Sequence, residues 1–193
     1  MRKFLPWIIV GGVVLIVIFW AMGIQNKALV FNQAVGKEWG NVETAYQRRN
    51  DLIGNLVNTV KGAADFEKST LTAVIEARAK ATSVTVDPAN ITPEQLTQFQ
   101  EAQAGVSSTL SRLLVNVERY PDLKANANFL KLQDELASTE NQILTARTRF
   151  NESVQAYNGY VLSIPQKWFL SGYPEKPYFK SVAGADKPVE VKF

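Results

Sequence analysis

The stretch RRNDLIGNLV, residues 48–57, places an arginine inside a helix seam that is otherwise apolar. Val35, Val42 and Leu56 follow a seven-residue spacing, and Arg49 takes the place between the last two. A second series has the same spacing: Trp39, Tyr46, Ile53 and Val60. Two such series predict an amphipathic helix that packs against other helices. A charge within this seam needs a partner once the helix is packed.

An uncharged apolar run, FLPWIIVGGVVLIVIFWAMGI at residues 4–24, precedes this helix. A membrane-spanning helix needs about 20 such residues, whereas the core of a cleaved signal peptide has about 7–15. Trp7 and Trp20 lie near the two ends of the run, where indole rings favour the membrane interface. We therefore expect residues 1–27 to form an anchor that contacts the lipid bilayer through residues 4–24. A cleaved signal peptide is the less favoured alternative.

The charges on either side of the apolar run indicate the orientation of the chain. Arg2 and Lys3 precede the run, and Lys27 and Lys37 follow it. The positive-inside rule then favours an N-terminus in the cytoplasm and a main domain outside it. The predicted location is the bacterial inner membrane, with a single span and an extracytoplasmic domain.

The composition excludes several classes of chemistry. The 193 residues include no histidine and no cysteine, so imidazole catalysis, thiol nucleophiles, disulfides and most zinc sites are excluded. The net charge of +3 arises from interspersed charges without a basic block, which argues against nucleic-acid binding. We expect no cofactor, no metal site and no enzymatic activity.

Beyond the anchor, the apolar residues recur with helical periodicity throughout. The helices are expected at residues 28–62, 65–82, 92–119 and 122–163. The third has a strong start signal, with a Thr92 cap, Pro93 at the first helical position and Gln95 three residues after the cap. Asp65 and Asp122 are the predicted caps of the second and fourth helices.

The fourth helix has the most regular apolar series. Its members recur at strict sevens: Phe129, Leu136, Ile143, Phe150 and Tyr157. Short links join the first helix to the second and the third to the fourth, so each pair is expected to be antiparallel. The fold class is therefore all-α, and residues 28–164 are predicted to form an antiparallel up-and-down four-helix bundle on the single N-terminal transmembrane helix. Because the amphipathic stripes begin after Ala28, this domain is expected to fold without residues 1–26.

Residues 165–193 form a C-terminal tail of different composition. Its first part carries five aromatic residues, interrupted by Gly172 and two prolines: Trp168, Phe169, Tyr173, Tyr178 and Phe179. A free linker would carry few aromatics. The tail therefore either docks on the bundle or awaits a partner.

A cluster of polar residues is the candidate site. It comprises Arg48, Arg49, Asp51 and Asn55 on the first helix, with Glu76 and Arg78 on the second. A hairpin that turns near Gly62 brings Glu76 level with Arg49, so we expect these two to form a buried ion pair and Arg78 to pair with Asp51. The alternative is a pocket that binds an anion or a peptide end. A di-metal site in a helix bundle would require histidine.

Several blocks of the chain resemble the LemA family in order and spacing. They are residues 47–62, 71–78, 118–126 with Phe129 and Glu140-Asn141, and 149–151 with Tyr157-Asn158. Gly54 departs from the pattern, because members commonly carry proline there; a bend at this position is thus less enforced. The resemblance implies a helical bundle on one N-terminal membrane anchor and no known enzyme activity.

The predicted function is a membrane-anchored scaffold or adaptor that mediates protein–protein interaction. Its expected partners are the bilayer, together with further copies of the chain or another membrane protein. The alternative is an anion- or peptide-binding receptor that uses the Arg48/Arg49/Asp51/Glu76 cluster. A solvent-filled pocket beside that cluster would distinguish the receptor from the scaffold.

Overall fold

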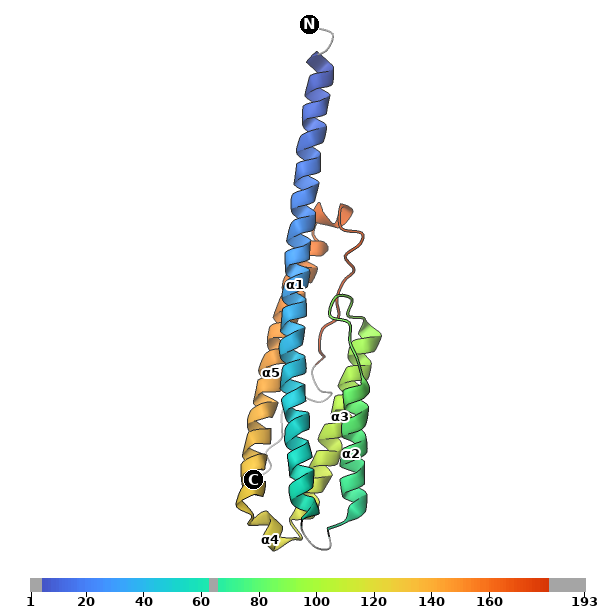
Figure 1. Ribbon diagram of the computed structural model, residues 1–193. Coiled ribbons are helices and arrows are strands. Elements are labelled where there is room, and N and C mark those ends of the chain that lie inside the picture. The colour runs from blue at the N-terminus through green and yellow to red at the C-terminus, as the bar shows by residue number, and fades with distance from the viewer. Residues whose placement is uncertain (1–4, 63–65, 181–193) are drawn as a thin grey trace, which may run out of the picture.

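The computed structural model describes residues 5–62 and 66–180 (Figure 1). Within these ranges all regular secondary structure is helical, which confirms the all-α expectation. The α-helices are α1 (Leu5–Lys61), α2 (Lys68–Ser83), α3 (Pro93–Val117), α4 (Pro121–Lys124) and α5 (Ala127–Val161), and a 3₁₀ turn η1 (Gln166–Trp168) follows them.

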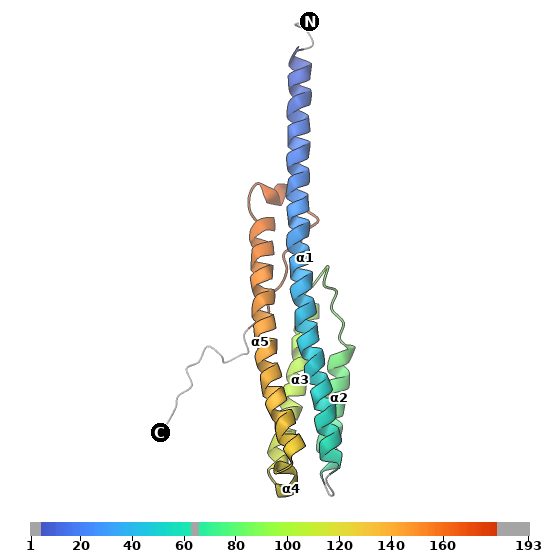
Figure 2. The ribbon, with the colours of Figure 1, turned by 60° about the vertical axis from the view of Figure 1, so that its left-hand side comes forward.

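Helix α1 is one unbroken helix of 57 residues. At about 1.5 Å per residue it is roughly 85 Å long. Its N-terminal third stands clear of the other helices in both views (Figures 1 and 2). By length and composition this helix could cross a membrane. Helix α1 continues through Gly54 without a break, whereas a proline at this position would enforce a bend.

The remaining helices lie beside the C-terminal two-thirds of α1. Helix α5 packs along α1, and α2 packs along α3 (Figure 2). The ring of Trp39 lies 5.5 Å from that of Phe150, and the ring of Phe31 lies 5.2 Å from that of Tyr160. Later residues of α1 therefore contact earlier residues of α5, so the two helices are antiparallel.

The buried apolar residues form two clusters along the length of the molecule. The cluster nearer the free part of α1 is rich in aromatic rings, including Trp39, Phe99, Phe150 and Phe179. The second cluster, near the turn after α1, is mostly aliphatic and includes Leu56, Val74 and Leu113. We call the packed part of the described chain, residues 24–62 and 66–180, the helical body.

Ile24 corrects one expectation about the N-terminal segment. Its side chain is only 5% exposed and belongs to the aromatic-rich core cluster. The hydroxyl of Tyr160 also donates a hydrogen bond to the carbonyl oxygen of Ile24 at 3.2 Å. The core therefore extends into the segment that was expected to serve only as an anchor.

The helix boundaries confirm one predicted start signal and correct another. The capping box of α3 is confirmed, with Gln95 N donating to Thr92 Oγ1 at 3.2 Å and Thr92 N donating to Gln95 Oε1 at 3.1 Å. The expected fourth helix is divided, because Asn126 rather than Asp122 caps α5. Asp122 instead lies in the first turn of α4, which Pro121 opens. Asp65 lies outside the described residues.

Candidate functional site

Arg49 is the buried centre of a polar node that joins three helices. Its side chain is 2% exposed. Nη1 donates to Glu140 Oε1 at 3.1 Å and to Ser107 Oγ at 3.2 Å. Nη2 donates to the carbonyl oxygen of Gln103 at 3.4 Å and to its side-chain Oε1. The acceptors come from α3 and α5, so the charge of α1 is matched across the interior of the helical body.

The ion pair of this node lies at the edge of the interior. Arg49 is buried, but the Glu140 side chain is 48% exposed. The carboxylate therefore keeps part of its hydration, which lowers the desolvation cost of the pair. Hydrogen bonds to a charged group are stronger than neutral ones, and those of this node connect α1 to both α3 and α5.

Tyr46 lies one helical turn before Arg49 and covers its charge. The guanidinium carbon lies 4.9 Å from the centre of the Tyr46 ring, within the range of a cation–π contact. Burial raises the pKa of Tyr46, and the charges of Arg147 and Arg49 oppose that rise. The phenol is therefore neutral at physiological pH and serves as a packing group.

The predicted ion pair between Arg49 and Glu76 is wrong. Glu76 is exposed on α2, whereas Arg49 pairs with Glu140. A hairpin turn near Gly62 brings the two residues to the same height, but pairing also requires that they have the right rotation about the helix axes. Val74 faces the core, and a residue two positions later points to the opposite side of a helix. Arg78, four positions after Val74, returns to the inner side.

The partner of Arg49 follows from the register of α1 and α5. Trp39 contacts Phe150, and these helices are antiparallel. Arg49 lies ten residues after Trp39, so it meets the residue ten before Phe150, which is Glu140. Glu140 borders the apolar stripe of α5, next to the buried Thr139. Sequence reasoning missed this pair because it compared only helices adjacent in the chain.

The remaining predicted residues form a separate surface group. Arg78 Nη2 lies 4.0 Å from Asp51 Oδ1, which confirms that predicted pair. Asp51 Oδ1 also accepts a hydrogen bond from Gln47 Nε2 at 3.0 Å. The side chains of Asp51 and Arg78 are 60% and 40% exposed, and exposed pairs of this kind add little stability. Arg48 and Asn55 are also exposed on α1.

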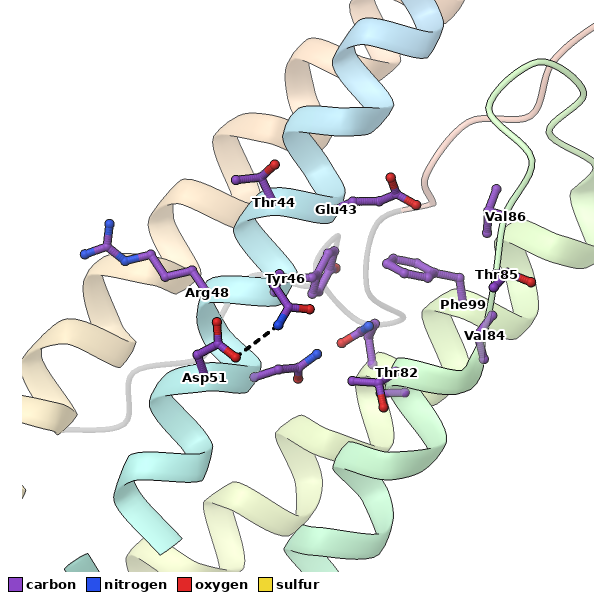
Figure 3. Close-up of a pocket in the computed structure, with 14 residues that line it drawn as sticks. Glu43, Thr44, Tyr46, Arg48, Asp51, Thr82, Val84, Thr85, Val86 and Phe99 are labelled. Atoms are coloured by element: carbon purple, nitrogen blue, oxygen red, sulfur yellow. Dashed lines mark hydrogen bonds between the residues drawn. The ribbon is translucent and has the colours of Figure 1, made fainter. Parts of the chain in front are cut away.

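A pocket of about 710 Å³ lies between α1 and the segment that leads from α2 to α3. Glu43, Thr44 and Arg48 line one side, and the 84–86 segment lines the other (Figure 3). The rings of Tyr46 and Phe99 meet edge to face at 5.0 Å and close its inner end (Figure 3). The pocket includes Arg48 and Asp51 but is not lined by Arg49 or Glu76.

A second pocket, of about 470 Å³, lies beside the Arg49 node. Arg49, Glu140, Arg147 and Lys180 are its charged lining residues. Arg147 Nη2 donates to the carbonyl oxygen of Lys180 at 2.8 Å. The six predicted cluster residues are thus divided between two pockets and the surface, and they do not converge on one ligand position.

The tail docks on the helical body, which decides between the two expectations for it. The Phe179 ring lies 6.0 Å from Trp39, 6.5 Å from Phe99 and 5.3 Å from Phe150. These rings belong to α1, α3 and α5, so Phe179 occupies a cage between three helices. At 5% exposure it is part of the core.

Two asparagines of α5 hold the tail backbone. Asn158 donates to the carbonyl oxygen of Lys176 and accepts from its N–H, both at 2.9 Å. Asn151 does the same for Phe179, at 3.1 and 2.9 Å. Seven helical residues rise about 10.5 Å and three extended residues span about 10 Å, so the two spacings match. The tail therefore runs extended and antiparallel along α5. Both asparagines lie in the blocks that resemble the LemA family, but nothing in their spacing indicates that they bind the tail.

Lys176 is a buried cation on the docked tail. Its Nζ donates to the carbonyl oxygen of Ala89 at 2.8 Å and lies 5.3 Å from the centre of the Tyr157 ring. Burial lowers the pKa of Lys176, and Asp87 opposes this effect. The Tyr157 hydroxyl donates to the carbonyl oxygen of Pro174 at 3.0 Å. Burial also raises the pKa of Tyr157 to about 12.

The acidic residues offer no metal position in the part of the chain that the structure describes. No group of three or more histidine, cysteine, aspartate or glutamate side chains converges there.

The two predicted interfacial indoles lie on the N-terminal third of α1, where Trp7 is 76% and Trp20 is 50% exposed. Trp20 lies edge to face with Phe169 at 5.5 Å.

Comparison with known proteins supports the resemblance seen in the sequence. The model of the LemA family matches residues 38–193. Magnetosome protein MamQ 2 of Paramagnetospirillum magneticum is 24% identical over 183 residues, which cover 85% of this chain and 67% of that protein. MamQ of Magnetospirillum gryphiswaldense is 25% identical, with 77% and 62% covered. Protein LemA of Metamycoplasma hominis is 23% identical, with 72% and 60% covered.

Proposed function

Because the chain belongs to the LemA family, we propose that it is a membrane-anchored helical scaffold that assembles copies of itself, or docks other membrane proteins, at the bacterial inner membrane. The long helices α1, α2, α3 and α5 act as an up-and-down four-helix bundle, and the apolar part of α1 is its single span. The protein has no catalytic role in this proposal.

The continuity of α1 is the observation that carries this proposal. One helix extends from the apolar segment into the core, where Trp39 and Val42 are fully buried. From Gln25 to Lys61 it rises about 55 Å at 1.5 Å per residue. A helix that is packed over most of this length is a rigid stalk. It would hold the far end of the bundle at a set distance from the bilayer.

The alternative function, an anion- or peptide-binding receptor, has less support. It requires Arg48, Arg49, Asp51 and Glu76 to face one pocket, but Arg49 is occupied by acceptors from α3 and α5, and Glu76 is exposed. The two pockets beside parts of the cluster can still be tested with small anions. The scaffold uses the outer surface of the bundle and needs no such pocket.

Self-assembly can be tested with single cysteines, because the chain has none of its own. Leu144→Cys places a thiol on the outer face of α5, where Leu144 is 63% exposed. Val154→Cys on the same helix is the matched control, since Val154 is fully buried. A bifunctional maleimide applied to native membranes should crosslink the first variant and not the second. If exposed positions around the bundle give neither a crosslinked dimer nor a crosslink to another membrane protein, the scaffold proposal fails.

The orientation of the bundle has a separate test. Val115→Cys carries its thiol near the C-terminal end of α3, and Val115 is 65% exposed. This end of α3 leads to α4, which lies at the end of the bundle far from the apolar segment (Figure 1). A membrane-impermeant maleimide added to intact spheroplasts should label it if the bundle is extracytoplasmic. Labelling only after the membrane is opened would place the bundle in the cytoplasm.

A further inference from the structure

The turn after α5 exposes large apolar side chains. Ile164 is 70% exposed, Trp168 is 73% exposed and Leu162 is 43% exposed. Lys167 is also exposed within this turn. Single exposed apolar residues are common on protein surfaces, but several within one short turn mark an interaction surface. We call residues 162–169 the membrane-proximal turn.

The membrane-proximal turn is fixed beside the apolar part of α1. Phe169 contacts Trp20, with 5.5 Å between the ring centres. One helical turn deeper in the body, the Tyr160 hydroxyl donates to the carbonyl oxygen of Ile24 at 3.2 Å. Both views show the turn next to α1 where that helix leaves the other helices (Figures 1 and 2). The turn is therefore level with residues 20–24 of α1.

The length of the apolar segment sets the level of the bilayer. A hydrocarbon core of about 30 Å takes about 20 residues at 1.5 Å per residue. A span that begins near Leu5 therefore ends near Ile24. Trp20 then lies about 6 Å inside the edge of the hydrocarbon core, so its indole ring can reach the interfacial layer that such rings prefer. Trp168 and Ile164 lie at the same level through the contact of Phe169 with Trp20.

We propose that the membrane-proximal turn is a second membrane contact, which inserts Trp168 and Ile164 into the interfacial layer of the bilayer that α1 spans. This rests on the proposed anchoring by α1. The surface is continuous with the apolar face of α1 at Trp20, so one bilayer covers both. Lys167 is exposed within the turn, and Lys27 follows the apolar segment with its Nζ 5.3 Å from the centre of the Tyr160 ring, so both can meet anionic headgroups.

Two membrane contacts restrict the orientation of the bundle more than a single contact does. A single helix holds the bundle at the membrane but leaves its tilt and its rotation about the helix axis free. The turn lies to one side of α1, so its insertion defines which side of the bundle faces the lipid. The tail continues from this turn to the Phe179 cage, and the membrane contact is therefore linked directly to the core.

The test uses the full chain at one copy per nanodisc, with phosphatidylethanolamine and phosphatidylglycerol as the lipids. An environment-sensitive fluorophore, NBD, is attached to single cysteines introduced into the cysteine-free chain. Trp168→Cys and Ile164→Cys report on the turn, and the second of these keeps the indole. Val115→Cys, 65% exposed at the far end, is the matched control, and Ile16→Cys, 68% exposed on α1, reports on the span itself.

Lipids with a nitroxide near the headgroup end of the acyl chain quench fluorophores in the interfacial layer. We expect the labels at both turn positions to emit at shorter wavelength than the Val115→Cys label and to lose about half of their emission to nitroxide lipid, as expected for an interfacial segment. The Val115→Cys label should keep its emission. The Ile16→Cys label should be shielded from aqueous iodide.

The remaining outcomes overturn one proposal or both. If Ile16→Cys is shielded but both turn labels behave like Val115→Cys, the second contact is wrong and the anchor stands. If Ile16→Cys is open to aqueous iodide, the anchoring fails and the second contact fails with it. Turn labels that emit at shorter wavelength without quenching by nitroxide lipid are covered by protein, which also overturns the membrane contact.

Discussion

A permanent charge is accommodated at position 49 because two other helices supply its acceptors. Glu140, Ser107 and Gln103 surround the guanidinium, and the ring of Tyr46 covers it. A buried ion pair of this kind adds little stability over apolar residues of similar size. Its geometric demands are strict, however, because a slip of α5 by one residue would carry Glu140 away from Arg49. We infer that the node sets the register of the helices.

The first prediction concerns the strength of this node. Glu140→Ala should lower the free energy of unfolding by about 2–3 kcal/mol, because it leaves the buried guanidinium without its counter-charge. Glu140→Gln retains an acceptor and should cost about 1 kcal/mol. The measurement is urea unfolding of the detergent-solubilised chain, followed by circular dichroism at the helical band.

Glu76→Gln is the matched control for that series. Glu76 is exposed on α2, so its change should stay within about 0.5 kcal/mol of the parent. A larger loss for Glu76→Gln than for Glu140→Ala would restore the ion pair that the hairpin argument predicted. Arg49→Leu combined with Glu140→Leu should recover most of the loss that Glu140→Ala causes.

Tyr157 provides a prediction for the docked tail. Tyr157→Phe removes the hydrogen bond to the carbonyl oxygen of Pro174 and should cost about 1 kcal/mol at neutral pH. The ordinary tyrosine pKa is 10.0, and the folded-state pKa of Tyr157 is about 12. As pH rises, the unfolded chain therefore loses the Tyr157 proton before the folded chain does. The stabilisation that the neutral Tyr157 hydroxyl provides is fully present below pH 10 and is lost as pH rises toward 12.

Thermal unfolding at pH 7, 9, 10 and 11 checks this prediction. The stability advantage of the parent over Tyr157→Phe should be constant up to about pH 9 and should shrink above pH 10. The comparison with the variant matters because burial also raises the pKa values of Tyr46 and Tyr160. An advantage that grows with pH above 10 would show that the phenol is not the group responsible.

At the scale of elements, α1 passes a glycine within its packed region without a break. Gly54 lies within the helix, and a Cβ atom at this position would meet the Arg78 guanidinium at 3.4 Å, which is ordinary van der Waals contact. Glycine inside a helix is less favourable than alanine by about 0.5–1 kcal/mol. The helix therefore keeps its continuity despite this residue, through the packing of its neighbours Ile53, Leu56 and Val57.

Gly54→Ala is predicted to stabilise the chain by about 0.5–1 kcal/mol. Arg78 is partly exposed and its flexible side chain can adjust to the added methyl group. A shift of the urea midpoint to higher concentration, with an unchanged slope, is the expected result. Destabilisation would mean that the close approach of Arg78 to the α1 backbone is needed for packing of α1 and α2.

Helix α5 makes two kinds of contact from neighbouring faces. Its apolar series packs on α1, while Asn151 and Asn158 bind the tail backbone along the same helix. Each asparagine satisfies an N–H and a carbonyl group of an extended chain that would otherwise lose its hydration on burial. The amide side chains therefore allow a strand-like segment to lie against a helix.

At the scale of the whole molecule, the apolar segment of α1 and the helical body overlap. Ile24 lies at the end of the apolar run and is also part of the core, and Trp20 contacts Phe169 of the tail. A chain that starts at Gly23 should therefore be more stable than one that starts at Lys27. The expected difference is about 1.5–3 kcal/mol, the value for burying one large aliphatic side chain.

Both truncated chains should remain helical, and urea unfolding compares their stabilities. The Ile24→Ala change in the longer one is the control, since it should remove most of the difference between them. Equal stability of the two chains would mean that the helical body does not need the end of the apolar run. A largely unfolded shorter chain would mean that the helical body depends on the end of the apolar segment for folding.

The features that the sequence determined by itself are local or periodic. The seven-residue spacing of Phe129, Leu136 and Ile143 sets a helical period and a buried face, whatever packs on it. The Thr92 capping box is a contact over three residues, so it needs no tertiary information. The length of the uncharged run alone makes α1 a candidate span.

The tertiary structure decided which distant faces meet. Helical periodicity identified Arg49 as a buried charge, but its partner depends on the mutual rotation and register of α1, α3 and α5, which local spacing does not contain. For the same reason the aromatic residues of the tail suggested docking without showing that Phe179 enters a cage of three helices. Such contacts between distant residues depend on how whole helices pack, because their energies are gained only after the chain has closed long loops.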